Sequence, residues 1–221
     1  MSEAKRAAGE AAAERVESGM RLGLGTGSTV AFFLDRLAAR GLDDIAGVPT
    51  SEATAAHCRE LGIELLGVGD VESLDLCVDG ADELTPDLVL TKGGGGALLR
   101  EKVVASLSRR MIVIATPDKV VDRLADTFAL PVEVVPFAAP AVARTLEHLG
   151  FEVVPRGDGA MRTDNGNAIL DARFPGGLPD PRAMAATLSA VPGVAEHGLF
   201  LDLGTEAILG HEDGTVSTIP A

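Results

Sequence analysis

Aromatic residues are scarce in this chain of 221 residues, which contains seven Phe, no Trp and no Tyr. A hydrophobic core must therefore be built from Leu, Val, Ile and Ala, and a hydrophobic content of 46% is enough for a sizeable one. No apolar run reaches the roughly 18 residues of a transmembrane helix. The N-terminal stretch is charged and rich in alanine, without the apolar segment of a signal peptide. We therefore expect a soluble, cytoplasmic protein with no membrane partner.

Cysteine is almost absent as well. Cys58 and Cys77 are the two cysteines, and neither lies at a spacing typical of a metal or redox motif. Because free cysteine is among the most buried residue types, two reduced and buried thiols are the expected state.

Basic residues are outnumbered, with 19 against 33 acidic residues and a formal net charge of −14. A broad acidic surface argues against nucleic-acid binding, which needs a basic footprint. Lysine is especially rare, being confined to Lys5, Lys92, Lys102 and Lys119. Either adaptation to a salty cytoplasm or a GC-rich genome that favours arginine would produce this bias, and both explanations stay open. In either case the few lysines that remain are the better candidates for a task.

The first half of the chain alternates short apolar runs with helical patterns. Such alternation predicts an α/β fold with a doubly wound, Rossmann-like parallel sheet. Strands are expected at 20–25, 45–50, 63–69, 74–83, 87–92 and 109–116, and helices at 3–18, 28–41, 51–62 and 97–108. Ligands of such sheets bind outside the carboxyl ends of the strands.

The second half has a different order of elements, β-α-β-β-α-β, which is the ferredoxin-like α+β unit. Strands are expected at 130–137, 151–156, 168–174 and 193–202, and helices at 138–150 and 180–191. Residues 206–210 read as a last strand that rejoins the first sheet. We therefore predict a catalytic α/β domain of residues 1–129 plus 206–221, with a smaller ferredoxin-like domain, 130–205, inserted into it.

Three polar or glycine-rich stretches follow predicted strands of the first domain, so all three should lie on one edge of its sheet. The first is GLGTGST, residues 23–29, whose glycines, hydroxyls and following helix N-terminus suit a phosphate. It lacks the G-x-G-x-x-G spacing, and no acidic ribose-binding residue ends the next strand, which disfavours a dinucleotide. A Walker loop is excluded because no G-K-[ST] follows. The alternative is a plain strand-to-helix turn capped by Ser28.

The second stretch is DGADE, residues 79–83. It crowds Asp79, Asp82 and Glu83 together after an apolar strand. Like charges packed closely raise one another's pKa, so such clusters tend to have a use in metal binding, sugar binding or proton transfer. No separate carboxylate cluster completes a magnesium site. The alternative is a solvated acidic turn in an acidic protein.

The third stretch is KGGGGALLREK, residues 92–102. Four consecutive glycines are costly, because glycine loses the most backbone entropy on folding. Lys92, bare backbone amides and the following carboxylate of Glu101 together supply a cation, hydrogen-bond donors and a base. That equipment suits removal of a proton next to a carbonyl, with donors to hold the developing oxyanion. The alternative for Glu101 is an exposed helical residue paired with Arg100 or Lys102.

Two further lysines are candidates at the same sheet edge. Lys119, in TPDKVVDRL after the strand 109–116, could meet a phosphate, and the alternative is a solvated lysine at a helix start. Lys5, on the first helix, is a weaker candidate.

Together, GLGTGST, DGADE, KGGGGALLREK and the lysine of TPDK resemble the ribose-5-phosphate isomerases of the A type. Order and spacing match along the whole chain, and the combination is far more specific than any one motif. The resemblance implies an enzyme that interconverts ribose 5-phosphate and ribulose 5-phosphate in the non-oxidative pentose phosphate pathway. It also implies a small sugar phosphate as the ligand, no metal or organic cofactor, and assembly as a homodimer or homotetramer.

The resemblance also assigns roles to residues. Glu101 would be the catalytic base, moving a proton between C2 and C1 through a cis-enediolate that Lys92 helps to stabilise. Asp79 and Asp82 would hold hydroxyls and help to open the furanose ring. The remaining substrate-binding positions would be Thr26, Gly27, Ser28, Thr29, Gly80, Ala81, Gly93, Gly94, Gly95 and Lys119, with Lys5 as a further phosphate contact. One departure is Gly96, where the family pattern has alanine, and it should loosen the helix start slightly.

Two other functions stay in view. An aminosugar-phosphate isomerase or deaminase would have a related glycine/threonine loop but would use a histidine near its acidic cluster. None of the four histidines, at positions 57, 148, 197 and 211, falls in the motifs. A sugar-phosphate sensor of the kind found in transcription regulators would not need Glu101, and no DNA-binding helix-turn-helix precedes the domain.

Overall fold

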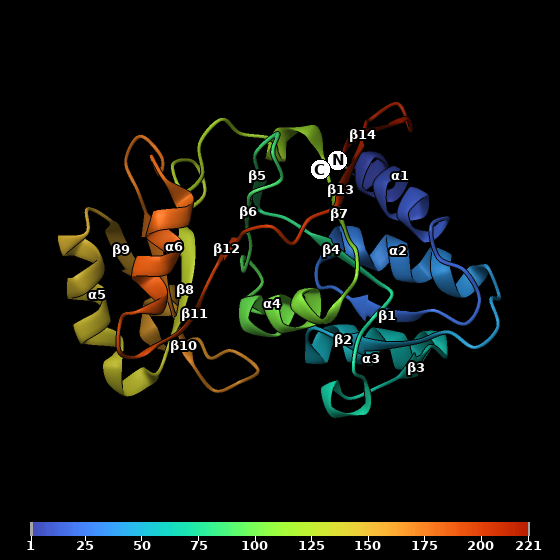
Figure 1. The fold of residues 1–221 in the computed structure, drawn as a ribbon, viewed down its shortest axis with the longest axis horizontal. Coiled ribbons are helices and arrows are strands. Elements are labelled where there is room, and N and C mark those ends of the chain that lie inside the picture. Colours follow the sequence, from blue (N-terminus) through green and yellow to red (C-terminus); the bar gives the residue numbers. More distant parts are fainter. Residues whose placement is uncertain (1, 221) are drawn as a thin grey trace. The chain divides into compact units, whose positions relative to one another are not determined.

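The computed structural model describes residues 2–220 (Figure 1). Contacts group this part of the chain into two compact units. Unit 1 comprises the residues up to Ala81, Arg100–Val120 and the residues from Asp202 on, and unit 2 comprises Asp82–Leu99 and Val121–Leu201. Residues 82–99 and 121–129 thus group with the second unit by contacts, whereas the sequence pattern placed them in the first domain. The domain boundaries at 129/130 and 205/206 stay a prediction.

Unit 1 is built around a seven-stranded sheet of order β14-β13-β7-β4-β1-β2-β3. Its strands are β1 (Arg21–Leu24), β2 (Ala46–Pro49), β3 (Glu64–Leu65), β4 (Leu76–Gly80), β7 (Met111–Ala115), β13 (Glu206–Gly210) and β14 (Val216–Pro220). All neighbours are parallel except β14, which pairs antiparallel with β13. Numbered along the chain, the six parallel strands run 3-2-1-4-5-6, which is the Rossmann order. The predicted fold class is confirmed, and the strand at 206–210 does rejoin this sheet.

The helices of unit 1 begin and end where local chemistry dictates. They are α1 (Ser2–Ala13), α2 (Ser28–Ala39) and α3 (Glu52–Leu61), with α4 (Leu98–Leu107) beginning in unit 2 and continuing into unit 1. The Ser51 side chain caps α3 by accepting a hydrogen bond from the Thr54 amide, and Gly62 ends it in the left-handed conformation. Gly9 lets α1 pack closely on α2, since a Cβ there would lie 2.7 Å from the Phe33 nitrogen.

Unit 2 contains a four-stranded antiparallel sheet of order β11-β8-β10-β9. Its strands are β8 (Leu130–Val134), β9 (Glu152–Pro155), β10 (Ala168–Arg173) and β11 (Val194–His197), and its helices are α5 (Ala139–His148) and α6 (Pro181–Ser189). Both helices contribute buried side chains to the same core as the strands, among them Leu146 and Leu188. The β-α-β-β-α-β order is therefore present as predicted.

A second, three-stranded sheet in unit 2 corrects one expectation. It has the order β12-β6-β5, formed by β5 (Glu83–Leu84), β6 (Leu90–Thr91) and β12 (Leu199–Phe200). The segment 87–92 was expected as a strand of the parallel sheet, and 74–83 as one strand. The chain instead breaks after β4, and β5 and β6 form an antiparallel hairpin. Only five residues separate β5 from β6, too few for the crossover that parallel strands need.

Candidate functional site

The loop after β1 leads into α2 through glycines. Gly27 precedes the first helical residue with φ 122°, a backbone conformation that favours glycine, and it has no side-chain cap. Ser28 is therefore the first residue of α2 and not its cap. Its hydroxyl accepts a hydrogen bond from Nζ of Lys5 at 2.9 Å, so two predicted residues from distant parts of the sequence meet here.

The hydroxyl of Thr26 belongs to a cluster of hydroxyl groups at the start of α3. It lies 2.7 Å from the Thr50 hydroxyl and 2.8 Å from that of Ser51. Thr54 completes the cluster and donates to the Gly25 carbonyl at 2.8 Å. The motifs singled out in the sequence did not include this support, although Thr50 ends a predicted strand and Ser51 directly follows it. The Thr26 side chain is thus held in place by α3.

Asp79 lies fully buried in β4, next to β1. Its Oδ1 accepts hydrogen bonds from the Thr26 amide at 3.1 Å and from the Gly80 amide at 2.7 Å. Gly25 makes this approach possible, because a Cβ there would contact the Asp79 carboxylate and lie 2.6 Å from the Val78 carbonyl. The chain order reverses between β1 and β4, which is where doubly wound sheets bind ligands. Unit 1 therefore brings GLGTGST and the first aspartate of DGADE together, as predicted.

Unit 2 brings Asp82 to the glycine loop. Oδ2 of Asp82 accepts a hydrogen bond from the Gly94 amide at 2.7 Å, and a Cβ on Gly94 would lie 2.5 Å from Oδ1 of Asp82. Gly93 and Gly96 have φ values of 106° and 84°. Glycine is therefore required for conformation at Gly93 and Gly96, and Gly94 leaves space for the Asp82 carboxylate.

Lys92 precedes the loop and is 2% exposed. Its amide donates to the Gly198 carbonyl at 2.8 Å, and its ammonium lies 5.5 Å from the centroid of the Phe200 ring. Burial to this degree is rare for lysine unless it is paired, so Lys92 is not an ordinary surface lysine.

Glu101 lies in the first turn of α4 and is 5% exposed. Its neighbour Arg100 pairs with Glu52 across 2.9 Å. The alternative of an exposed helical glutamate therefore fails.

Lys119 lies in a short 3-10 helix (Pro117–Lys119) directly after β7, at the expected sheet edge. Its half-exposed side chain lies 3.8 Å from Asp118.

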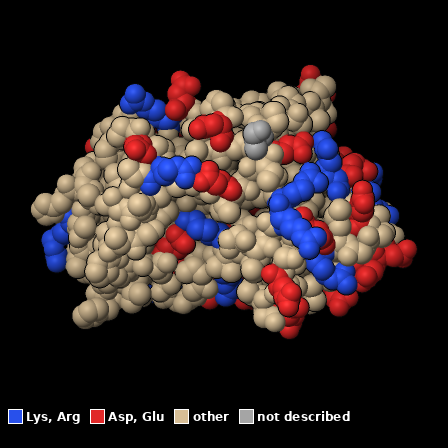
Figure 2. All heavy atoms as spheres, viewed as in Figure 1, with Lys and Arg blue, Asp and Glu red and all other residues tan. Residues whose placement is uncertain are grey.

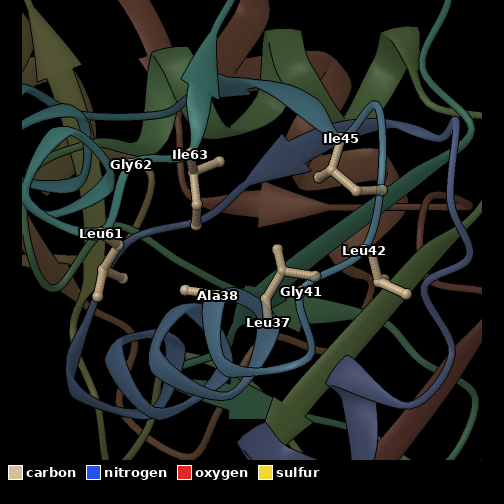
Figure 3. Close-up of a pocket in the computed structure, with 8 residues that line it drawn as sticks. All are labelled: Leu37, Ala38, Gly41, Leu42, Ile45, Leu61, Gly62 and Ile63. Carbon is tan, nitrogen blue, oxygen red and sulfur yellow. The ribbon is translucent and has the colours of Figure 1, made fainter.

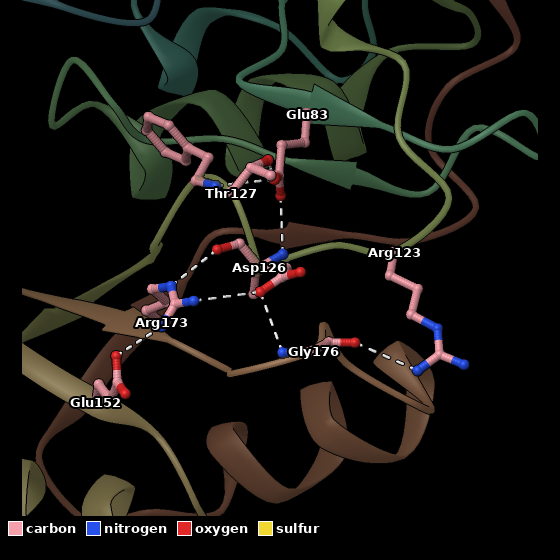
Figure 4. Close-up of polar contacts among 9 residues, drawn as sticks. Glu83, Arg123, Asp126, Thr127, Glu152, Arg173 and Gly176 are labelled. Atoms are coloured by element: carbon pink, nitrogen blue, oxygen red, sulfur yellow. Dashed lines mark hydrogen bonds and ion pairs between the residues drawn. The ribbon is translucent and has the colours of Figure 1, made fainter.

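Glu83, the third acid of DGADE, has a structural role. It is 2% exposed and its carboxylate accepts hydrogen bonds from the Ala125 amide, the Thr127 hydroxyl and the Phe128 amide, at 2.8, 2.7 and 3.0 Å. Figure 4 shows these contacts beside an exposed network of Arg173 and Asp126. Glu83 thus holds the segment that leads into β8, and the expected crowding of three acids is resolved into separate environments.

The described residues form no metal cluster, and one apolar cavity lies away from the residues above. Across residues 2–220 no group of three His, Cys, Asp or Glu side chains could hold a metal ion, and no helix of that range is long and apolar enough to cross a membrane. A small cavity of about 120 Å³ in unit 1 is lined by apolar side chains and glycines such as Leu37, Ile45, Leu61 and Gly62 (Figure 3). It lies where α2 and α3 end, before β2 and β3 begin, and so at the other edge of the sheet from Asp79.

Charge on the face drawn in Figure 2 is mixed, with acidic side chains interspersed among arginines and lysines. Several of the described ion pairs join exposed side chains, for example Arg36 with Glu14 and Arg173 with Glu152. Such pairs contribute little to stability.

The chain matches known proteins over nearly its whole length. The family model described as ribose 5-phosphate isomerase A (phosphoriboisomerase A) matches residues 46–214. Among curated relatives, ribose-5-phosphate isomerase A of Caulobacter vibrioides (strain NA1000 / CB15N) is 52% identical over 98% of this chain and 97% of its own. The protein of that name from Rhizobium meliloti (strain 1021) is 52% identical over 94% of this chain and 93% of its own.

Solved structures agree with the sequence relatives. Ribose 5 phosphate isomerase A from Neisseria gonorrhoeae superposes with a TM-score of 0.93 at 37% identity, covering 99% of this chain and 96% of that one. A D-ribose-5-phosphate isomerase in complex with phospho-erythronic acid gives a TM-score of 0.95 at 38% identity, covering 99% and 98%. With a family model that matches residues 46–214 and relatives 52% identical over nearly the whole chain, this chain belongs to the ribose 5-phosphate isomerase A family.

Proposed function

We propose that the chain interconverts D-ribose 5-phosphate and D-ribulose 5-phosphate through an enediolate, with Glu101 as the base. This is an aldose-ketose isomerisation of the non-oxidative pentose phosphate pathway. Family membership over nearly the full chain supports the activity. The observation that supports the mechanism is the burial of the Glu101 carboxylate in the first turn of the helix that follows the glycine loop.

The reaction needs a base and a way to hold negative charge. Glu101 takes the proton from C2 of the open-chain aldose and returns it to C1, while a proton moves from the C2 hydroxyl to the oxygen at C1. Between the two transfers the electron pair resides on an enediolate, whose oxygens need hydrogen-bond donors. Lys92 and amides of the loop Gly93–Gly95 supply these donors, and each is worth about 3 kcal/mol in a transition state of this kind.

The aspartates have the complementary task of holding sugar hydroxyls and opening the furanose ring. Asp79 is suited to this because amides of Thr26 and Gly80 already fix its Oδ1. Asp82 is similarly fixed by the Gly94 amide. Two groups of residues complete the substrate contacts: Thr26, Gly27, Ser28 and Thr29 from the first loop, and Gly80, Ala81 and Lys119 from the ends of β4 and β7. Lys5, bound to Ser28, is a further phosphate contact.

Turnover of ribose 5-phosphate in EDTA tests this proposal, with wild type beside Glu101→Gln. We expect wild-type activity to survive chelation and the variant to lose about 10²- to 10⁴-fold in kcat, the usual contribution of a general base. Glu147→Gln, the same change at an exposed glutamate of α5, is the matched control and should keep full activity. Full activity of Glu101→Gln would discard Glu101 as the base but keep the isomerase.

A ligand-binding measurement separates the enzyme from a sensor. We propose that the chain also binds phospho-erythronic acid, as the related isomerase does, because its carboxylate resembles the enediolate in charge and shape. A folded wild type that binds ribose 5-phosphate without turning it over would favour the sensor and contradict the isomerase. Release of ammonia from an aminosugar phosphate would favour the deaminase alternative.

We also infer a cytoplasmic protein that assembles as a homodimer or homotetramer, as the resemblance implies. Light scattering coupled to size-exclusion chromatography tests the assembly, and a monomer at micromolar concentration would contradict it. Adaptation to high salt stays a proposal that rests on the net charge of −14.

A further inference from the structure

Arg156 of unit 2 contacts the backbone of the glycine loop from a segment more than 60 residues away in sequence. It lies between β9 and β10, at the start of a short 3-10 helix (Arg156–Gly159). Its Nη1 donates to the carbonyl of Gly93 at 2.9 Å and to the carbonyl of Gly94 at 3.1 Å. One guanidinium nitrogen therefore joins two consecutive peptide units.

The guanidinium of Arg156 is also bound by a carboxylate of unit 2, that of Asp171. Nε of Arg156 donates to Oδ2 of Asp171 in β10 at 2.9 Å, and Nη2 donates to Oδ1. Both side chains are mostly buried, at 18% and 25% exposed. A two-point arginine–carboxylate pair of this kind fixes the plane of the guanidinium, and a single ammonium could not do the same. Arg156 is thus a rigid donor attached to the sheet of unit 2.

The consequence for the loop follows from peptide geometry. In a trans peptide unit the C=O of one residue and the N–H of the next point in opposite directions. A hydrogen bond that fixes the Gly93 carbonyl therefore also fixes the Gly94 amide, which donates to Asp82 at 2.7 Å. By the same geometry, the bond to the Gly94 carbonyl fixes the direction of the Gly95 amide. The Gly94 amide is thus already bound to Asp82, whereas Gly95 is exposed and offers the amide of this pair that could meet a ligand.

Glycine peptide units are the ones whose orientation depends most on hydrogen bonds from other residues. Without a Cβ, a glycine peptide unit flips between orientations that other residues cannot reach. Donors assist a transition state only when they are already oriented, since reorientation during the reaction would cost the energy they are meant to supply. The loop needs glycine for space beside Asp82 and Leu98. Within the loop the Gly96 amide donates to the Gly93 carbonyl at 2.9 Å, and the hold on the Gly94 carbonyl comes from Arg156.

We propose that Arg156 is a positioning residue for catalysis, which orients the Gly95 amide toward the enediolate by holding the Gly94 carbonyl, and keeps the Gly94 amide on Asp82 by holding the Gly93 carbonyl. The inference rests on the proposed function, because it assigns a partner to the amides that would stabilise the intermediate. Arg156 itself touches no substrate in this scheme. Its removal should impair the stabilisation of charge and leave the binding of the phosphate group intact.

The test compares Arg156→Met and Arg156→Lys with the control Arg162→Met. Arg162 also donates to two backbone carbonyls, those of Gly159 and Met161, but these belong to its own segment. We expect Arg156→Met to lower kcat by about 10- to 100-fold, somewhat below the loss of a whole oxyanion donor. KM should change by less than about threefold, since binding of the ground state is not affected. Arg156→Lys should lie between Arg156→Met and wild type, and Arg162→Met should match wild type.

Two binding constants distinguish positioning from general structural damage. Arg156→Met should weaken binding of phospho-erythronic acid, whose carboxylate needs the loop amides, and should leave binding of inorganic phosphate unchanged. Asp171→Asn, which leaves Arg156 in place with a weaker anchor, should show the same pattern with a smaller loss.

The opposite results are equally clear. Unchanged kcat in Arg156→Met would overturn the inference. So would an equal loss of affinity for phospho-erythronic acid and phosphate, accompanied by a lower melting temperature, because Arg156 would then be merely structural. Absence of turnover in wild type would instead contradict the proposed function, and the two failures are therefore distinguishable.

Discussion

Each unit of the molecule places a glycine against an aspartate, but the two arrangements differ in rigidity. In unit 1 Gly25 packs on Asp79, which is fully buried in β4. In unit 2 Gly94 packs on Asp82, which lies in the half-exposed turn before β5. A backbone amide bonds to the aspartate in both places, from Thr26 and from Gly94 respectively.

The difference lies in what surrounds each pair. A Cβ on Gly25 would also meet the Val78 carbonyl at 2.6 Å, and that carbonyl is part of β4 and cannot move. A Cβ on Gly94 would meet the Asp82 side chain, which can rotate toward solvent. The central strands thus hold their aspartate by packing, whereas the glycine loop is held by hydrogen bonds to Asp82 and Arg156. A substitution that disturbs the packing should therefore lower stability, whereas one that disturbs the hydrogen bonds of the loop should lower activity.

Alanine at each glycine should give the largest contrast. Gly25→Ala forces two central strands apart and should lower the free energy of unfolding by about 1–3 kcal/mol, as overpacking of a core does. Gly94→Ala should leave the free energy of unfolding nearly unchanged and lower kcat, because Asp82 and the loop amides move. Urea unfolding together with steady-state kinetics measures both. Equal destabilisation by the two variants would break the comparison.

Substitutions of the two acids Asp79 and Glu83 should likewise differ, one affecting kcat and the other stability. Glu83→Gln replaces one carboxylate oxygen by a donor that faces other donors, which should cost about 1–3 kcal/mol of stability. That is a drop in Tm of about 2–12 °C for a chain of this size. Its kcat, measured well below Tm, should stay close to wild type. Asp79→Asn should do the reverse, with kcat strongly reduced, and a fully active Asp79→Asn would contradict a role for Asp79 in the reaction.

Salt should weaken the repulsion between exposed acidic side chains and have little effect on the buried ones. The net charge of −14 implies self-repulsion, which salt screens over about 10 Å at 0.1 M and less at higher concentrations. Thermal unfolding from low to molar KCl should show Tm rising for wild type and by the same increment for Glu83→Gln. A flat or falling curve would remove salt adaptation as the reason for the acidic composition and leave codon bias.

The smallest effect on stability is expected for Cys58, a core residue of α3 in unit 1. Burial raises the pKa of its thiol from 9.0 to about 11. Above pH 9 the unfolded chain loses this proton first, so stability is fully present below about pH 9 and falls as pH rises toward about 11. Urea unfolding at both ends of this range should show a slightly steeper loss for wild type than for Cys58→Ala. Equal losses would show that the thiol does not contribute.

The sequence alone determined the class of fold and the candidate residues. Alternating apolar runs predicted the parallel sheet, the order β-α-β-β-α-β predicted the second sheet, and the strand at 206–210 has the predicted limits. Glycine in KGGGGALLREK and in GLGTGST marked places of close backbone approach, and Gly25 and Gly94 show that contact. These features are readable because they depend on neighbours in the chain.

Only the tertiary structure decided which residues support these positions. The hairpin of β5 and β6 left the parallel sheet, Glu83 turned away to bind residues 125–128, and Thr26 received its hydroxyl partners from α3. Arg156 reached the glycine carbonyls across 62 and 63 residues. No local pattern encodes such pairings, because each depends on which strands become neighbours when the chain folds. Hydrogen bonds between residues distant in sequence therefore cannot be read from the sequence, and they are what the tertiary structure contributes to the site.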